Sequence, residues 1–366
     1  MARTQPLMAT GPRESTPNFI LGATMTARTA RRLRSTFWIT VVCVAYGATF
    51  DIAMTIYETG AIGRPWFGIS IGVCLGVSLS FLENSSFAER LDRFPFTVAL
   101  IAKTTTYVLV LTVIIVFGGL VFGTMTMVSA TPEPSLLAQP DFYVFLGMTL
   151  SLYAIIIFFR QLDRLLGPGV LIKFLLGRYH RPRREHRVFM FLDLKSSTSI
   201  AERLSKEAYY SFVNDFLRDL SLPVLNAGGE IYQYVGDEVV LSWKHEMGTR
   251  DANCLRVFFA IDAAIEGWKK HYLNRYGIVP EYKAGAHLGE VITAQIGDLK
   301  KEIVHNGDVL NTAARIQSMC NELGRRFVVS KQLIQAVEVP KDFSIEQLGA
   351  VALRGKAEPI ELVALA

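Results

Sequence analysis

The sequence predicts an α-helical transmembrane bundle followed by an α+β domain with a mostly antiparallel sheet and flanking helices. The first observation is a change of composition: residues up to about 159 form long apolar runs, and charges return from residue 160 onward. All six histidines lie after residue 179. The second observation is the alternation of helical stretches with hairpin-connected strands in the second half, which is typical of an α+β domain.

Four apolar segments are long enough to cross a bilayer, since about 20 helical residues span about 30 Å of hydrocarbon. They are residues 36–57, 66–82, 96–122 and 142–159. We therefore expect a membrane domain with four transmembrane helices at 36–160. The alternative for one of these segments is a buried core helix of a soluble fold, which would leave an odd number of spans.

The charges that flank these segments predict the orientation. Residues 1–35 carry six Arg against one Glu, and the loop at 83–94 carries Arg90 and Arg93, whereas the other two loops contain only Arg64. Because basic residues stay on the cytoplasmic side, we expect a multi-pass protein of the inner or plasma membrane with both termini in the cytoplasm. The first apolar stretch is too long for a cleaved signal peptide.

Asp51 and Lys103 are ionisable residues inside the predicted spans, where charge is costly and indicates function by default. At 1.5 Å per residue, Asp51 lies about 22 Å and Lys103 about 10 Å from the inner face, which disfavours a direct pair. Lys103 is expected to extend toward the cytoplasm. Asp51 faces a polar bundle interior or the outer interface, or it takes part in sensing a ligand or ion.

Residues 161–186 form a basic juxtamembrane connector in which apolar residues recur at helical spacing. A Gly-Pro-Gly stretch at 167–169 argues against one rigid helix. Two interpretations remain open: an amphipathic segment that lies on the inner leaflet, or an element that transmits the state of the membrane domain to the domain that follows.

In the domain at 187–366, two carboxylates, Asp193 and Asp237, stand at the ends of apolar strands. Asp193 leads directly into a Ser-Ser-Thr helix start with free N–H groups, and Asp237 lies in a hairpin turn. Such a pair beside a helix N-terminus can hold divalent metals and a triphosphate together. The alternatives for either residue alone are a helix cap and an ordinary turn residue. The expected elements are a strand at 188–194, helices at 199–204 and 206–226, a hairpin at 230–243, a helix at 250–276, strands at 282–296 and 302–305, a helix at 308–323, a strand at 326–330 and a strand pair within 343–365.

Three further motifs follow in order: AGAHLGE at 284–290, HNGDVLNTAAR at 305–315 and GKAEPIEL at 355–362. Together with the two aspartate motifs, they resemble the catalytic core of class III nucleotidyl cyclases, the adenylyl/guanylyl cyclase superfamily. The resemblance covers residues 187–366. It implies a ferredoxin-like core and a reaction in which the ribose 3′ oxygen attacks the α-phosphate and pyrophosphate leaves.

The resemblance assigns roles to individual residues. Asp193 and Asp237 match two metal-binding aspartates, which implies two Mg²⁺ or Mn²⁺ ions per active site. Asn311 matches a ribose-orienting residue and Arg315 a transition-state arginine on the same helix face, with a solvated polar face as the alternative. Phosphate contacts are implied for the side chain of Lys356, otherwise a basic residue in a surface turn, and for the backbone of Leu194, Lys195, Ser196, Ser197 and Thr198. Thr198 also fits a helix cap, and His287 is expected to pack in the core.

Gln233 and Val304 occupy the two base-selecting positions of the family, and they match neither the adenylyl nor the guanylyl pattern. Gln233 can donate to N1 of adenine and accept from its amino group, or bind guanine with its amide flipped. Val304 offers no hydrogen bond. ATP is the expected substrate, and GTP is the alternative.

The family builds each active site across a dimer interface. Because this chain carries both the aspartates and the Asn/Arg pair, the resemblance implies a homodimer with two equivalent sites. The expected function is a membrane-bound adenylate cyclase that makes 3′,5′-cyclic AMP from ATP for intracellular signalling, with the lipid bilayer as a further partner and no nucleic-acid partner. The competing expectation is a catalytically silent membrane sensor or scaffold that dimerises through this domain.

Overall fold

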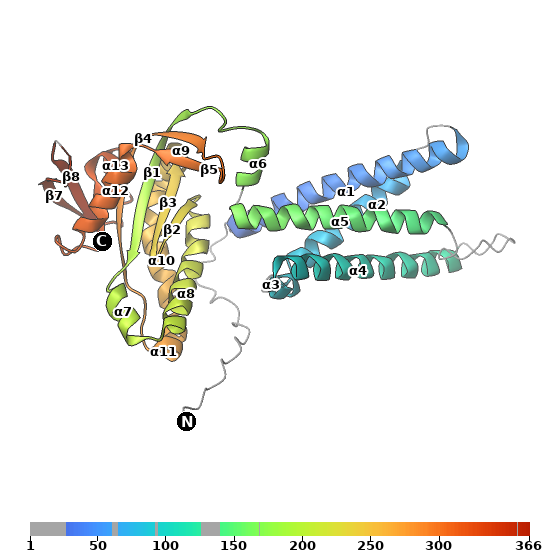
Figure 1. Ribbon diagram of the computed structural model, residues 1–366, viewed down its shortest axis with the longest axis horizontal. Helices are drawn as coiled ribbons and strands as arrows, with labels where there is room; N and C mark the ends of the chain where they lie inside the picture. The colour runs from blue at the N-terminus through green and yellow to red at the C-terminus, as the bar shows by residue number, and fades with distance from the viewer. Residues whose placement is uncertain (1–26, 61–64, 92–93, 126–139, 168, 357) are drawn as a thin grey trace, which may run out of the picture. The chain divides into compact units, whose positions relative to one another are not determined.

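The chain folds into a helical unit and an α+β unit (Figure 1). The computed structural model describes all residues except 1–26, 61–64, 92–93, 126–139, 168 and 357. The helical unit is Thr29–Arg178, and the α+β unit contains Tyr179–Ala366. The predictions for most of the basic N-terminal segment, and those for Arg64, Arg93 and Pro168, lie outside the described residues.

Each of the four apolar segments coincides with a helix of the helical unit. The helices are α1 (Ala27–Thr59), α2 (Trp66–Glu83), α3 (Ser86–Leu91), α4 (Phe96–Met125), α5 (Pro140–Leu166) and α6 (Val170–Leu175). Among the described residues, two stretches are long and apolar enough to cross a membrane: Arg32–Tyr57 in α1 and Leu146–Asp163 in α5. Gly68–Glu83 and Phe96–Val110 are shorter apolar helices.

Glycines allow α1 and α2 to approach closely. A Cβ on Gly47 would lie 2.1 Å from the carbonyl oxygen of Gly68, and one on Gly76 would lie 2.4 Å from the Cα of Thr40. Small residues permit such backbone contact between apolar helices. Next to this contact, the Asp51 carboxylate accepts a 2.9 Å hydrogen bond from the N–H of Gly68. Asp51 therefore satisfies one of the free N–H groups in the first turn of α2.

Lys103 does not extend toward solvent, because its side chain is fully buried. Its Nζ lies 3.4 Å from Oε1 of Glu83, whose side chain is also fully buried. Tyr107 donates a 2.9 Å hydrogen bond to the other oxygen of this carboxylate, and Nε of Arg160 lies 3.6 Å from Oε1. Lys103 therefore points toward Glu83, at the edge of the predicted cytoplasmic loop, and the Glu83 carboxylate compensates a charge that burial alone would make costly. The cluster joins α2, α4 and α5.

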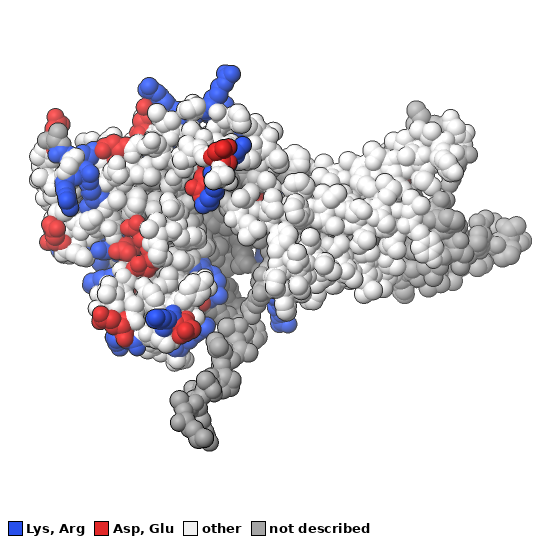
Figure 2. Space-filling view, viewed as in Figure 1, with Lys and Arg blue, Asp and Glu red and all other residues white. Residues whose placement is uncertain are grey.

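The two units differ in the polarity of their surfaces. On the face shown in Figure 2, Lys, Arg, Asp and Glu side chains gather on the α+β unit, whereas the helices present almost only uncharged atoms. Large apolar side chains such as Phe37, Trp38 and Phe81 are more than half exposed on the helices. Such a surface is typical of helices that contact lipid or another protein.

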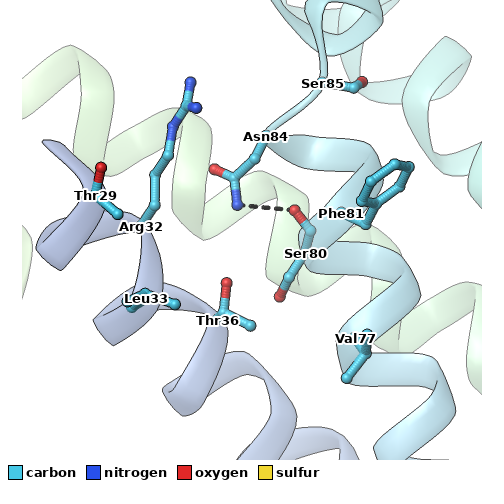
Figure 3. Close-up of a pocket in the computed structure, with 9 residues that line it drawn as sticks. All are labelled: Thr29, Arg32, Leu33, Thr36, Val77, Ser80, Phe81, Asn84 and Ser85. Carbon is cyan, nitrogen blue, oxygen red and sulfur yellow. Dashed lines mark hydrogen bonds between the residues drawn. The ribbon is translucent and has the colours of Figure 1, made fainter.

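A cavity of about 430 Å³ opens between α1 and α2 (Figure 3). It is lined by Thr29, Arg32, Leu33, Thr36, Val77, Ser80, Phe81, Asn84 and Ser85. The side-chain amide of Asn84 donates to the backbone oxygen of Ser80 at 2.8 Å. The buried Ser80 hydroxyl has no hydrogen-bond partner among the described residues.

The α+β unit is built on one sheet with the strand order β2-β3-β1-β4-β6-β8-β7, and β5 pairs with β4. The strands are β1 (Arg183–Leu194), β2 (Glu230–Val235), β3 (Glu238–Lys244), β4 (Tyr282–Ile296), β5 (Glu302–Asn306), β6 (Phe327–Ser330), β7 (Ile345–Val351) and β8 (Ile360–Leu365). The pairing of β4 with β6 is parallel, and the other pairings of the described strands are antiparallel. The predicted α+β class with flanking helices is confirmed.

Alternate residues of β1 face two different cores. Val188, Met190 and Leu192 belong to the main core, which also contains side chains of α8 and α10. Phe189 belongs to a second cluster with Val309 and Ala313 of α12. This period of two is what an extended strand requires when both faces are covered. The helices are α7 (Ser197–Arg203), α8 (Lys206–Asn226), α9 (His245–Thr249), α10 (Asn253–Gly267), α11 (Lys269–Tyr276), α12 (Asp308–Met319) and α13 (Lys331–Gln335).

Two expected elements differ from the structure. The helix predicted at 250–276 is divided into a 3₁₀ turn, α10 and α11, because Asp251 and Ala252 adopt positive φ and the chain leaves helical geometry at Trp268. Strand β1 begins five residues before the apolar run that predicted it, because the polar stretch from Arg183 pairs with β4. Backbone pairing therefore extends the strand beyond its hydrophobic pattern.

Candidate active site

Asp193 lies near the C-terminal end of β1, where both neighbouring strands place charged residues opposite it. Its Cα partners are Glu238 on β3 and Lys283 on β4. Gln317 of α12 donates a 3.2 Å hydrogen bond to Oδ2 of Asp193, and Nζ of Lys283 lies 3.6 Å from the same atom. Burial and the charge of Asp237 raise the pKa of Asp193, and Lys283 and Gln317 oppose that shift.

Asp237 lies in the turn between β2 and β3, after Gly236, whose φ of +65° suits glycine. Its Oδ2 atom is buried and has no hydrogen-bond partner within the described chain. Burial, together with the charges of Asp193 and Asp237, raises the pKa of Glu238 to about 6. The strand ends therefore carry more negative charge than their surroundings neutralise.

This surplus of negative charge fits a divalent cation, because Mg²⁺ and Mn²⁺ prefer carboxylate oxygens. The orphaned Oδ2 of Asp237 is the atom that a cation would satisfy. The described residues contain no group of three or more His, Cys, Asp or Glu side chains arranged for a metal. A cation at Asp193 and Asp237 would therefore take its remaining ligands from backbone carbonyls, water or substrate phosphates.

The loop after Asp193 differs in part from expectation. Leu194 is buried, and the backbone N–H of Lys195 donates to the carbonyl oxygen of Glu281 at 2.8 Å, so it is not free for phosphate. The cap position of α7 is Ser196 with a left-handed φ of 57°, and no side chain caps the helix. Thr198 is therefore not the cap, since α7 begins at Ser197. The N–H groups of Ser197 and Thr198 lie in the first helical turn, which lacks intrahelical acceptors.

Asn311 and Arg315 lie one turn apart on α12, with Asn311 exposed and Arg315 half-buried. A Cβ on Gly355 would lie 3.2 Å from Nη2 of Arg315, so the guanidinium packs against the loop before β8. Within the described chain, neither side chain has a hydrogen bond or an ion pair, whereas Gln317 on the same helix bonds Asp193. Among the described residues, no hydrogen bond or ion pair therefore joins Asn311 or Arg315 to the two aspartates.

Lys356 lies in the same loop and contacts the carboxylate of Asp308 at the start of α12. This contact lowers the pKa of Asp308. His287 is buried as expected, with Nδ1 2.7 Å from the hydroxyl of Ser330, and burial lowers its pKa to about 4. The structure thus places Lys356 beside the helix of Asn311 and Arg315.

Gln233 lies on β2 and Val304 on β5, two strands that do not pair with each other in the sheet. Gln233 is exposed beside a register shift in the β2–β3 pair, and Val304 is half-buried opposite Ala294 of β4. Their chain neighbours touch: the N–H of His305 donates to the hydroxyl of Tyr232 at 3.3 Å. The structure therefore brings the two predicted base-contacting segments side by side.

Sequence reasoning missed four residues around the aspartates. Lys283, Gln317 and Glu238 surround Asp193, and Tyr209 of α8 has a raised pKa through burial and through the charge of Asp237. For Lys283, the signal is its register opposite Asp193, which becomes visible once β1 and β4 are paired.

A sheet with two carboxylates at adjacent strand ends and an Asn/Arg pair on α12 is the arrangement expected of a nucleotidyl cyclase catalytic domain. Residues 181–365 match the family described as adenylate and guanylate cyclase catalytic domain, and the chain belongs to that family.

The similarity to one curated relative extends beyond the catalytic domain. The chain is 29% identical over 331 residues to Adenylate cyclase 2 of Rhizobium meliloti (strain 1021), which covers 89% of each chain. It is 24% identical over 179 residues to an adenylate cyclase of Anabaena cylindrica, which covers 47% of this chain and 35% of that protein. A bacterial light-regulated adenylyl cyclase structure shares the fold, with a TM-score of 0.50, 20% identity, and coverage of 65% of this chain and 67% of the other.

Proposed function

We propose that this protein is a membrane-bound adenylate cyclase that converts ATP to 3′,5′-cyclic AMP and pyrophosphate. The observation that carries the proposal is the buried, unpartnered Oδ2 of Asp237 beside an Asp193 whose pKa its charge raises. The similarity to Adenylate cyclase 2 of Rhizobium meliloti supports it, because that similarity extends over the helical unit as well.

Asp193 and Asp237 would hold two Mg²⁺ or Mn²⁺ ions, which would lower the pKa of the ribose hydroxyl and neutralise the triphosphate. Asn311 orients the ribose so that its 3′ oxygen faces the α-phosphate. The planar guanidinium of Arg315 spreads its charge over the phosphoryl oxygens, and Lys283 places a second positive charge beside the phosphates. The 3′ proton leaves to water or to a phosphate oxygen, and pyrophosphate departs.

The substrate base is proposed to be adenine, held by the side-chain amide of Gln233. Purified full-length protein is incubated with ATP or GTP and Mn²⁺, and the products are identified by mass spectrometry. We expect more cyclic AMP from ATP than cyclic GMP from GTP. Preference for GTP would make the protein a guanylate cyclase. The absence of both products would favour the silent sensor or scaffold, which the unusual pair Gln233 and Val304 suggests as the second candidate.

The active unit is proposed to be a homodimer with two shared sites. Asn311 and Arg315 have no hydrogen bond or ion pair within one described chain, which fits a site completed by a second subunit. Co-expression of Asp237→Ala with Arg315→Ala tests this arrangement. Random pairing makes half of the dimers mixed, each with one intact site, so activity should recover to about a quarter of wild type. Mixed dimers as inactive as the separate variants would place the whole site within one subunit.

The helical unit is proposed to cross the membrane four times, with both chain ends in the cytoplasm. The apolar surface of the helices and the basic flanks of α1 and α5 support this orientation. Single cysteines introduced at Glu58 and Arg90 should react with a membrane-impermeant maleimide from opposite sides. Labelling of both from the same side would contradict the proposed topology.

A further inference from the structure

Arg187 of β1 is fully buried, and its guanidinium binds residues of three other strands. Nη1 lies 2.8 Å from Nε2 of His305 on β5 and 3.1 Å from the hydroxyl of Ser242 on β3. Nη2 donates to Glu230 of β2 at 2.9 Å, and Nε lies 3.3 Å from Glu185. None of these residues belongs to the proposed catalytic set. The proposed catalytic roles therefore do not explain why Arg187 makes these contacts.

The contact with Arg187 fixes the protonation of His305. Arginine can only donate hydrogen bonds, so Nε2 of His305 must accept, and the ring is neutral with its proton on Nδ1. Nδ1 then donates to the hydroxyl of Thr293 on β4 at 2.8 Å. Thr293 in turn donates to Oε2 of Glu185 at 3.2 Å, and Glu185 pairs with Arg187. The ion pair between Glu185 and Arg187 closes this chain of hydrogen bonds into a ring of contacts.

This ring of side-chain contacts lies directly beside the segments that are proposed to hold the base. His305 follows Val304 in β5, and its ring centroid is 4.9 Å from that of Tyr232, the residue before Gln233. The N–H of His305 also donates to the hydroxyl of Tyr232. β5 lies off the main strand path and pairs only with β4 among the described strands, so side-chain contacts of His305 with β1 and β2 add to this single backbone pairing.

We propose that neutral His305, held by Arg187, is a positioning residue that fixes the Val304 segment against the Gln233 segment and thereby sets nucleotide affinity and base preference. The proposal rests on the proposed function, in which these two segments contact the base. His305 acts through its neighbours and does not touch the reacting atoms. Loss of its contact with Arg187 should therefore alter binding more than the chemical step.

Acidification should weaken nucleotide binding through the same contact. A protonated His305 would turn an N–H toward the guanidinium of Arg187 and add a second positive charge beside it. Among the described residues, Arg187 of β1, Tyr232 of β2 and Thr293 of β4 contact His305, and Glu185 and Glu230 pair with Arg187 beside it. The two glutamates already pair with Arg187, so they cannot replace the lost acceptor.

The test compares three variants of the full-length protein. His305→Ala removes the acceptor, His305→Gln keeps an acceptor oxygen without a titrating group, and His186→Gln is the control. His186 lies next to Arg187 on β1, but its side chain is 66% exposed. The readouts are KM and kcat for ATP, and the ratio of affinities for N-methylanthraniloyl ATP and GTP measured by fluorescence.

For His305→Ala we expect KM to rise about tenfold with kcat within about threefold of wild type, and the affinity ratio to change by at least about threefold. His305→Gln and His186→Gln should stay close to wild type at neutral pH. As the pH falls below about 7, wild-type affinity should fall more steeply than that of His305→Gln, which carries no titrating group at this position.

An unchanged KM and affinity ratio in folded His305→Ala would overturn the proposal, and so would a loss confined to kcat. If His305→Ala does not fold, the pH profile of His305→Gln decides, because an acid limb identical to that of the wild type contradicts the proposal. If the wild type binds nucleotide but forms no cyclic product, the proposed function fails while the affinity ratio still tests the role of His305. If the wild type binds no nucleotide, both proposals fail.

Discussion

The helical unit and the α+β unit each bury carboxylates, but they treat the charge differently. In the helical unit, Glu83 is surrounded by Lys103, Arg160 and the hydroxyl of Tyr107, all within 3.6 Å of its oxygens. In the α+β unit, the buried Oδ2 of Asp237 has no hydrogen-bond partner in the described chain. The neighbouring Asp193 has one nearby cation, Lys283.

This difference distinguishes a structural ion-pair cluster from a ligand-binding site. A buried carboxylate that meets its cations within its own chain holds helices together and needs nothing from outside. The charge of Asp237 raises the pKa of Asp193 and of Glu238, which indicates excess negative charge that a bound cation can neutralise. Charge balance therefore points to the strand ends at Asp193 and Asp237 as the ligand site.

The largest effect is expected at Asp237. Asp237→Asn keeps the shape of the side chain but removes a charge that the proposed cations need, so activity should fall by at least about a thousandfold. Folding should be unharmed, because the change also relieves repulsion with Asp193 and Glu238. The measurements are kcat and hydrogen exchange of the α+β unit. Appreciable turnover at saturating metal would contradict the assignment.

In the helical unit, removing the charge of Glu83 should lower stability. Glu83→Gln leaves Lys103 buried without its counter-charge, which should cost about 3–5 kcal/mol of unfolding free energy. The double variant Glu83→Gln/Lys103→Met should regain most of that loss. The matched control is Arg184→Gln, which breaks an exposed pair with Glu290 and should cost less than about 1 kcal/mol. Equal losses in the single and double variants, measured by denaturant unfolding in detergent, would refute the compensation.

His287 shows a third solution, in which a buried group avoids charge altogether. Folded His287 stays neutral down to about pH 4, whereas the unfolded side chain takes up a proton near pH 6.5. Its contribution to stability is therefore fully present above pH 6.5 and is lost as the pH falls toward 4. The loss should reach about 3 kcal/mol. Hydrogen exchange of the α+β unit across this range should show the slope, and His287→Gln should flatten it.

The smallest effect is expected at Lys283, which partly balances Asp193. Lys283→Gln should raise the nucleotide KM about tenfold, since one positive charge beside the phosphates is lost. It should also raise the pKa of Asp193 further, so that the acid limb of the activity profile moves to higher pH. Lys300→Gln, on an exposed side chain, is the control. If the acid limb of the activity profile does not move, Lys283 does not influence the pKa of Asp193, which would contradict this prediction.

Local patterns predicted the α+β fold and the position of both aspartates at strand ends, because strand alternation, helix periodicity and short motifs each extend over no more than about 20 residues. What local patterns could not supply was pairing at long range. The register that sets Lys283 opposite Asp193, and the contact of Gln317 with Asp193, depend on which strands and helices become neighbours. The pairing of Lys103 with Glu83 was missed for the same reason, since Glu83 was placed in a loop.

The central claim is that the α+β unit needs a cation from outside and the helical unit does not. Mn²⁺ titrated into full-length protein, with the free ion read by electron paramagnetic resonance, tests this claim directly. Wild type and Glu83→Gln should bind Mn²⁺ with equal affinity, and Asp237→Asn should bind at least about tenfold more weakly. Equal binding by all three proteins, or a loss of binding in Glu83→Gln, would contradict the account.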